Sequence, residues 1–247
     1  DPAKPIPPDL RRQALAQARK LRHRGPDWSG VFSDERAVLC HERLSIVDVE
    51  HGAQPLLDTL QGTVLAVNGE IYNHQELRQG LREVHDFQTL SDCEVILYLY
   101  DELKPRDFLN RMNGIFAFVL YDPKRETYLI ARDPIGVIPL YVGWDRHDHL
   151  YAASEMKALV GHCDRIREVP PGHFFLGHEA DRGFQRYYEP DWAAPGHVPS
   201  EPYDPARLRV ALEAAVKRQL MCDVPYGVLI SGGVDSSLVS AIAAQFR

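Results

Sequence analysis

Short apolar runs separated by turn residues dominate the middle of the chain, and this pattern predicts consecutive β-strands. Ile115–Tyr121 and Thr127–Ala131 flank the turn pair Asp122-Pro123, so they are predicted to form a hairpin. Shorter runs predict further strands at residues 37–40, 64–67, 139–141, 150–153 and 173–176. Strands that follow one another in sequence typically pair into antiparallel sheets.

Helical spacing of apolar residues is confined to a few segments. Helices are predicted over residues 10–23, 74–83 and 95–103, and a helical turn over residues 154–159. Asp9 is the expected N-cap of the first helix and Gly25 its stop. Ser91 and Glu94 form the pattern of a capping box that opens the third helix. Because strands and helices are grouped in this way, the predicted fold class is α+β.

The composition changes between residues 190 and 205, which hold five prolines and few aliphatic side chains. We predict a linker over residues 191–206 that separates a domain at residues 1–190 from a second domain that starts within residues 207–247. Asp204 is the expected N-cap of a helix that has Pro205 at its first position. Tyr226–Ile230 then predicts a strand that leads into a glycine-rich turn and a last helix.

Charge and composition exclude several classes of partner. A net charge of −7 gives no electrostatic reason to expect nucleic acid or an anionic membrane. The longest apolar run is far shorter than the ~20 residues that span a bilayer, and the first residues lack the apolar core of a signal peptide. The four cysteines are widely spaced without a CxxC pair, and no HExxH occurs among the eleven histidines. These features predict reduced thiols, a cytoplasmic location and no metal site.

The stretch VLAVNGEIYN, residues 64–73, holds the first candidate for chemistry. Asn68 and Gly69 follow an apolar run, and Asn-Gly is the strongest short signal for a hairpin turn. The same pair at the end of a strand could also donate two hydrogen bonds to one oxygen, as an oxyanion hole does. This stretch alone favours the turn, and only the motifs in the rest of the chain reverse that preference.

Three charged residues suggest a site for an amino acid. Taken alone, Arg43 is better interpreted as an exposed strand residue; the alternative is a guanidinium that binds a carboxylate through its planar donors. The carboxylates of Glu70 and Asp92 suit an ammonium group, and Asp92 at a helix start could face outward to accept from it. Their spacing in sequence does not by itself bring these three side chains together.

The segment SGGVDSS, residues 231–237, combines two glycines with hydroxyl groups between a predicted strand and a helix. Backbone N–H groups at such a turn, together with the dipole of the helix, form a cradle for an anion. No Gly-Lys-Ser/Thr follows, so the segment is not a Walker A loop. A plain glycine turn is the weaker interpretation.

These motifs carry a resemblance to a known family. SGGVDSS after an apolar strand resembles the pyrophosphate loop of the N-type ATP pyrophosphatases. Upstream, RHRGPDWSG, HERLSIVD, VNGEIYNH, SDCEVI, RDPIGVIPLY and SEMKAL resemble the class II, N-terminal-nucleophile glutaminase domain. In this order they are similar to the glutamine-hydrolysing asparagine synthetases. The resemblance implies a four-layer αββα glutaminase fold followed by the first elements of an α/β synthetase domain.

The resemblance also implies roles for individual residues. Arg43 would bind the α-carboxylate of glutamine, Glu70 and Asp92 its α-ammonium, and Asn68 with Gly69 would form the oxyanion hole. The implied glutamine site comprises Arg43, Leu44, Ser45, Ile46, Val47, Asn68, Gly69, Glu70 and Asp92. The implied ATP site comprises Ile230, Ser231, Gly232, Gly233, Asp235, Ser236 and Ser237. ATP and Mg²⁺ would convert aspartate to β-aspartyl-AMP, and ammonia from glutamine would then give asparagine, AMP and pyrophosphate. A homodimer is left open.

The sequence departs from the family at its start. The family's nucleophile is an N-terminal cysteine whose own α-amine acts as base, whereas this sequence starts with Asp1. None of Cys40, Cys93, Cys163 and Cys222 has a free α-amine. We therefore expect a piece of a longer enzyme, truncated at both ends and inactive as a glutaminase by itself. The alternatives are a β-lactam-synthetase-like relative with a non-catalytic glutaminase scaffold, and a non-catalytic amino-acid-binding module.

Overall fold

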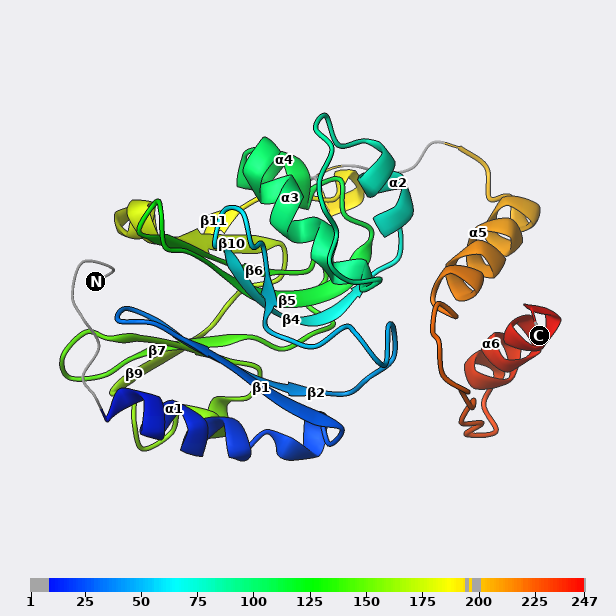
Figure 1. Cartoon of the computed structure of the whole chain (residues 1–247). Coiled ribbons are helices and arrows are strands. Elements are labelled where there is room, and N and C mark those ends of the chain that lie inside the picture. The colour runs from blue at the N-terminus through cyan, green and yellow to red at the C-terminus, as the bar shows by residue number, and fades with distance from the viewer. Residues whose placement is uncertain (1–8, 194–195, 197–200, 247) are drawn as a thin grey trace. The chain divides into compact units, whose positions relative to one another are not determined.

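The predicted hairpin forms the two central strands of a six-stranded sheet in the computed structural model, which describes residues 9–193, 196 and 201–246 (Figure 1). Its strands are β5 (Gly114–Asp122) and β6 (Thr127–Arg132), which pair antiparallel. On β5, Phe116 and Phe118 belong to one core cluster and Ala117, between them, belongs to another. Successive side chains of a strand point to opposite faces, so both faces of this sheet are covered.

The hairpin is part of a six-stranded sheet in the order β11-β10-β6-β5-β4-β3. All of its neighbouring strands are antiparallel. The other strands are β3 (Leu56–Leu57), β4 (Val64–Ile71), β10 (His173–Leu176) and β11 (Gln185–Arg186). β4 lies next to the central strand β5 along its whole length, from Val64 opposite Tyr121 to Ile71 opposite Gly114.

Three helices cover one face of this sheet (Figure 1). They are α2 (His74–Gln79), α3 (Val95–Glu102) and α4 (Pro105–Leu109). The first turn of α3 and the end of α4 supply Ile96, Phe108 and Leu109, which are fully buried in the same cluster as Phe116. Burying side chains of this size stabilises the layer by about 1.5–3 kcal/mol each.

The opposite face packs on two smaller antiparallel sheets, with α1 (Leu10–Arg19) outside them (Figure 1). One sheet pairs β1 (Trp28–Ser33) with β2 (Val38–Arg43). The other has the order β8-β7-β9, with β7 (Tyr141–Trp144), β8 (Leu150–Ala153) and β9 (Arg165–Glu168). Ala117 and Ile130 of the six-stranded sheet share a core cluster with Val142 of β7. The succession of helix, sheets, sheet and helices gives four αββα layers.

Short 3₁₀ helices complete the described secondary structure. They are η1 (Arg22–Arg24), η2 (Asp92–Glu94), η3 (Met156–Ala158), η4 (Gly177–Arg182), η5 (Asp191–Ala193) and η6 (Ala244–Phe246). Of these, η2 matters for the site because it carries Asp92 directly before α3.

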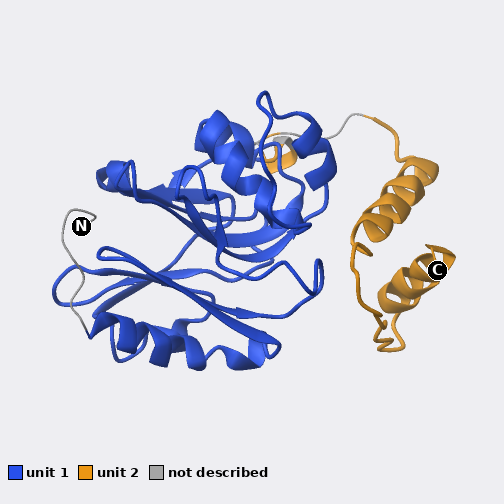
Figure 2. Ribbon diagram, in the orientation of Figure 1, with its two compact units in different colours: residues 1–189 blue, residues 190–247 orange. Residues whose placement is uncertain are grey.

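Figure 2 shows the two compact units into which the chain divides, residues 1–189 and residues 190–247. The second unit contains α5 (Pro205–Arg218) and α6 (Val234–Ala243). The predicted cap of α5 is confirmed, because the Asp204 carboxylate accepts from the N–H groups of Ala206 and Arg207. Of the predicted linker, residues 194–195 and 197–200 lie outside the described residues. The assignment of domains within these ranges stays a prediction.

The turn considered at Asn68 and Gly69 is wrong. Strand β4 continues through both residues to Ile71, with Asn68 opposite Ala117 and Gly69 opposite Phe116 of β5. Local turn propensity is overridden here, because β-structure depends on the neighbouring strand more than on intrinsic preference. Gly69 nevertheless has a φ of 150°, and a Cβ there would lie 2.1 Å from the carbonyl oxygen of Ile115. A glycine is therefore required by the close approach of β5.

Other local predictions also need correction. Tyr226–Ile230 forms no strand, and no described residue pairs with it, although a strand requires hydrogen-bond partners. The Asp9 side chain makes no capping bond, and the first helix ends at Arg19 rather than at residue 23. The second helix ends at Gln79, where Gly80 is the C-cap. Strands β1, β3, β9 and β11 were not predicted.

The capping box at Ser91 is only half correct. The Ser91 hydroxyl accepts from the N–H of Cys93 at 3.3 Å, as an N-cap does. The Glu94 carboxylate instead accepts from the N–H groups of Gln88 at 2.7 Å and Thr89 at 2.8 Å. This buried carboxylate orders the loop before Ser91 rather than capping the helix.

Candidate active site

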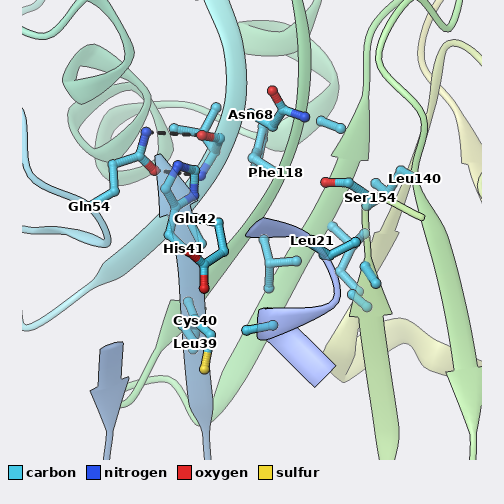
Figure 3. Close-up of a pocket in the computed structure, with 18 of the residues that line it drawn as sticks. Leu21, Leu39, Cys40, His41, Glu42, Gln54, Asn68, Phe118, Leu140 and Ser154 are labelled. Carbon is cyan, nitrogen blue, oxygen red and sulfur yellow. Dashed lines mark hydrogen bonds between the residues drawn. The ribbon is translucent and has the colours of Figure 1, made fainter. Parts of the chain in front are cut away.

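A cavity of about 680 Å³ lies within the first unit, between β2, β4, β5 and β8 (Figure 3). Its size is typical of sites for small molecules. One part of its wall is apolar and includes Leu39, Leu140 and Leu150. The other part is polar and contains most of the predicted glutamine site, namely Arg43, Leu44, Ile46, Val47, Asn68, Gly69, Glu70 and Asp92. Residues from two separate strands, a loop and the 3₁₀ helix η2 thus meet in one place.

Ser45 is the exception among the predicted glutamine-binding residues. It is not part of the cavity wall, and its N–H donates to the Asp27 carboxylate at 2.8 Å. That bond holds the Ser45 backbone on the outer side of the loop that follows β2.

Arg43 is the last residue of β2, and its guanidinium group is buried beneath the loop that follows. It donates to the carbonyl oxygens of Val47 at 2.9 Å, Asp48 at 2.7 Å and Val49 at 3.1 Å. These three bonds fix the plane of the guanidinium. Because the group lines the cavity, its position suits a carboxylate, which binds guanidinium in a defined plane.

Glu70 and Asp92 form the acidic part of the cavity. Asp92 is buried, contrary to the prediction that it faces outward, and its carboxylate accepts from the Ile71 N–H at 2.6 Å. Burial and the charge of Asp92 raise the pKa of Glu70 to about 7. Burial also raises the pKa of Asp92, although its bond from Ile71 opposes this. Neither carboxylate forms an ion pair within the part of the chain that the structure describes, so an ammonium ligand would satisfy both.

Asn68 and Gly69 line the same cavity as Arg43 and the acidic pair. The Asn68 side chain is drawn in Figure 3, and its amide has no hydrogen-bond partner among the described residues. An amide group held on a paired strand and left without a protein partner can donate to a ligand oxygen. This arrangement fits the predicted oxyanion hole, in which donors are fixed before charge develops.

Two thiols line the same cavity, but both are held in the neutral form. Burial raises the pKa of Cys40 to about 11. Burial and the neighbouring Asp92 carboxylate raise the pKa of Cys93 well above its usual value. A thiolate is the reactive form of cysteine, so neither side chain is suited to act as a nucleophile near neutral pH.

Three further polar residues, two in the cavity wall and one bonded to Arg43, had no role assigned to them from the sequence. Gln54 lines it and makes two hydrogen bonds to the backbone of Val67. His41 lines it as well, and burial lowers its pKa to about 4, so the ring is neutral. Asp48 accepts from Arg43 through its carbonyl and from the Leu90 N–H through its carboxylate, at 2.8 Å. His41 and Asp48 belong to the segment HERLSIVD, but their contacts, like those of Gln54, are made by the fold and are not encoded by the local sequence.

The predicted ATP loop lies in the second unit, directly before α6. Gly232 has a φ of 85°, a conformation that favours glycine, and Gly233 is the N-cap of the helix. The hydroxyls of Ser231 and Ser236 lie 3.0 Å apart, and that of Ser237 donates to the Gly233 carbonyl at 2.8 Å. These bonds order a turn at a helix N-terminus, where free N–H groups favour phosphate oxygens. The donor set therefore fits a phosphate.

Neither a resident metal centre nor a membrane span is found in the described ranges. Within residues 9–193, 196 and 201–246, no group of three His, Cys, Asp or Glu side chains could hold a metal ion. No described helix is both long and apolar enough to cross a bilayer.

Comparison with known proteins identifies the class. The sequence profile described as the glutamine amidotransferase domain matches residues 7–171, so the chain belongs to the glutamine amidotransferase domain family. A second profile, described as asparagine synthase, matches residues 207–247. The order of the two matches is that of the motifs in the sequence, and the resemblance to glutamine-hydrolysing asparagine synthetases is confirmed.

The curated relatives carry that name. Asparagine synthetase B [glutamine-hydrolyzing] of Escherichia coli is 53% identical over 238 residues, which cover 96% of this chain and 42% of that protein. A probable asparagine synthetase [glutamine-hydrolyzing] of Dictyostelium discoideum is 47% identical over 242 residues, which cover 96% of this chain and 43% of that protein. The chain thus spans about two fifths of the length of these relatives.

Solved structures confirm the fold class. The allosteric regulatory enzyme of purine biosynthesis matches with a TM-score of 0.60 at 22% identity, covering 94% of this chain and 61% of that one. The glutamine phosphoribosylpyrophosphate amidotransferase of B. subtilis matches with a TM-score of 0.58 at 22% identity, and the match covers 98% of this chain and 62% of that one. The mixed α and β architecture of this chain is the N-terminal-nucleophile glutaminase fold.

Proposed function

We propose that the chain is part of a glutamine-dependent, ATP-consuming ligase that makes asparagine, and that its first unit is the glutaminase. One observation carries the proposal: a single cavity joins a fixed guanidinium, two carboxylates and an amide on a strand, and among the described residues the carboxylates have no cation and the amide no hydrogen-bond partner. These groups match the carboxylate, the ammonium and the side-chain carbonyl of glutamine.

The proposed chemistry assigns one task to each group. Arg43 binds the α-carboxylate of glutamine, and Glu70 with Asp92 binds the α-ammonium. A thiolate attacks the side-chain amide carbon, and Asn68 with Gly69 donates to the oxygen that becomes negative. The amide nitrogen takes up a proton and leaves as ammonia, and water then hydrolyses the resulting thioester to glutamate and the free thiol. Loss of one oxyanion donor typically costs about 3–4 kcal/mol of transition-state stabilisation.

The attacking thiolate is proposed to come from an N-terminal cysteine, as the family resemblance implies. The raised pKa values of Cys40 and Cys93 support this, because neither thiol ionises readily at neutral pH. On this proposal the full-length protein that carries the chain has both the nucleophile and the α-amine that serves as its base.

The second unit is proposed to bind ATP through its glycine-rich loop. The backbone of Ser231–Gly233 and the first turn of α6, with Asp235, Ser236 and Ser237, would cradle the phosphates, and Ile230 would lie beside the nucleotide. Mg²⁺ would accompany the phosphates and neutralise part of their charge. Aspartate would become β-aspartyl-AMP, and attack by ammonia would give asparagine with AMP and pyrophosphate.

The proposed domains are residues 1–190 and the part from residue 207, joined by residues 191–206. The proposed enzyme is cytoplasmic and forms a homodimer.

The test is a product balance in the full-length protein. Glutamine, aspartate and MgATP should yield glutamate, asparagine and pyrophosphate, and ammonium chloride should replace glutamine. Asp235→Ala should abolish pyrophosphate formation while glutamate release persists, because the loop and the glutaminase cavity belong to separate units. Absence of glutamate release would contradict the proposal. Pyrophosphate release that neither glutamine nor ammonia stimulates would favour the β-lactam-synthetase-like alternative.

A further inference from the structure

One edge of strand β4 pairs with β5, and its other edge is covered by different groups at different positions. On this second edge, β3 pairs only with Val64 and Leu65. Two residues further on, the Val67 N–H donates to Oε1 of Gln54 at 2.9 Å, and the Val67 carbonyl accepts from Nε2 of Gln54 at 2.9 Å (Figure 3). The side-chain amide of Gln54 therefore takes the place of a neighbouring strand.

The same edge is covered again beyond Gly69. The Ile71 N–H donates to the Asp92 carboxylate at 2.6 Å. Backbone groups of every second strand residue point to the same edge, so those of Gly69 face the gap between Gln54 and Asp92. The bond from the Cys93 thiol to the Gly69 carbonyl, at 3.5 Å, agrees with this direction. Gln54, Gly69 and Asp92 all line the cavity.

We infer that Gln54 is a positioning residue of the oxyanion hole: its amide fixes Val67, the residue before Asn68, so that Asn68 and Gly69 present their donors to the cavity. A primary amide donates and accepts at once, and so can pair with both backbone groups of one residue. A misplacement of about 1 Å at a reacting centre can cost about 10²-fold in rate. This inference rests on the proposed glutaminase function.

The test compares Gln54→Met with Gln61→Met in the full-length protein. Gln61 is a suitable control because its side chain accepts from Lys124 and does not line the cavity. Gln54→Met should lower kcat for glutamate release at least about tenfold, since donor placement matters mainly in the transition state. KM for glutamine should stay within about twofold, because Arg43, Glu70 and Asp92 are retained. Asparagine formation from ammonia should be unchanged in both variants.

Several outcomes would overturn the inference. Unchanged kcat in Gln54→Met would do so, and so would a rise in KM that matches the fall in kcat. Equal loss of the ammonia-dependent reaction would indicate a merely structural role. If Gln54→Met fails to fold, Gln54→Glu gives the same test, because an ionised carboxylate still accepts from Val67 but cannot donate to it.

Hydrogen exchange of the backbone amides provides a readout that does not depend on activity. The Val67 amide should exchange at least about fivefold faster in Gln54→Met than in the wild type and in Gln61→Met, because its N–H loses its hydrogen bond to Gln54. Unchanged exchange at Val67 would overturn the inference. If the wild type instead releases no glutamate but the exchange difference is present, the proposed function fails while the positioning of this strand by Gln54 stands.

Discussion

Glu70 and Asp92 line one cavity with no cation paired to either among the residues described, and burial together with the charge of Asp92 raises the pKa of Glu70 to about 7. A carboxylate with this pKa changes its charge within the physiological range. The ammonium of a bound amino acid would stabilise the ionised form and lower that pKa again. Ligand affinity and the protonation of Glu70 are therefore linked.

This linkage predicts a pH dependence of KM. Only the ionised form of Glu70 attracts an ammonium, and its fraction rises as pH increases through about 7. KM for glutamine should therefore fall between pH 6 and pH 8 and level off above, as steady-state kinetics in a constant-ionic-strength buffer would show. Glu70→Gln should raise KM and flatten this profile. A profile of KM as steep in Glu70→Gln as in the wild type would contradict the assignment.

Substitution of Arg43 should affect binding more than turnover. Its guanidinium holds three carbonyl groups and would bind a carboxylate in the ground state and the transition state alike. Arg43→Ala should raise KM for glutamine about tenfold or more, because bonds to charged groups contribute about 1.5–3 kcal/mol. Arg43→Lys should rescue little, since a lysine lacks the planar fork. Arg165→Ala is the matched control, because Arg165 pairs with Asp148 away from the cavity.

Asn68→Ala, in contrast to Arg43→Ala, should affect turnover more than binding. Removal of one oxyanion donor should lower kcat for glutamate release by about 10²–10³-fold, with a much smaller change in KM. Synthesis from ammonia in the same variant is the internal control, because it bypasses the glutaminase cavity. Comparable loss of both reactions, or loss of the folded state, would mean that Asn68 supports the strand rather than the chemistry.

Gly69→Ala should destabilise the first unit. The added Cβ would lie 2.1 Å from the Ile115 carbonyl oxygen and 2.6 Å from the Phe116 Cα, so β4 or β5 must shift. Overpacking of this kind costs about 1–3 kcal/mol or more, which corresponds to a fall in Tm of several degrees by calorimetry. Gly80→Ala, whose Cβ would meet its nearest neighbour at 3.4 Å, should change Tm by less than a third as much. Equal Tm values for the two variants would mean that β5 does not approach Gly69 this closely.

The sequence predicted those elements that are determined by the burial or the local contacts of their own side chains. β5 and β6 are apolar along almost their whole length because both of their faces are covered, and the cap at Asp204 depends on neighbouring N–H groups only. Asn68-Gly69 misled the local interpretation, because pairing with β5 decides its conformation. Tyr226–Ile230 has the composition of a strand, but no described segment lies beside it to accept its hydrogen bonds.

The candidate site was predicted from motifs, and the residues that support those motifs were not. Arg43, Glu70 and Asp92 belong to recognisable segments and meet in the cavity. The contact of Gln54 with Val67 joins a side chain to a backbone across a loop, and no local pattern encodes it. The same is true of Glu94, whose carboxylate bonds to Gln88 and Thr89 instead of completing a cap.

The connection between the strands has a consequence for the order of folding. β5 ends at Asp122 and β6 begins at Thr127, whereas β4 ends at Ile71 and β5 begins only at Gly114. Closing a short loop is fast and costs little entropy, and long-range pairing is slower. We expect pulsed hydrogen exchange during refolding to protect β5 and β6 before β4. Because β4 carries Asn68, Gly69 and Glu70, competence to bind glutamine would be acquired at the end of folding, after the scaffold has formed.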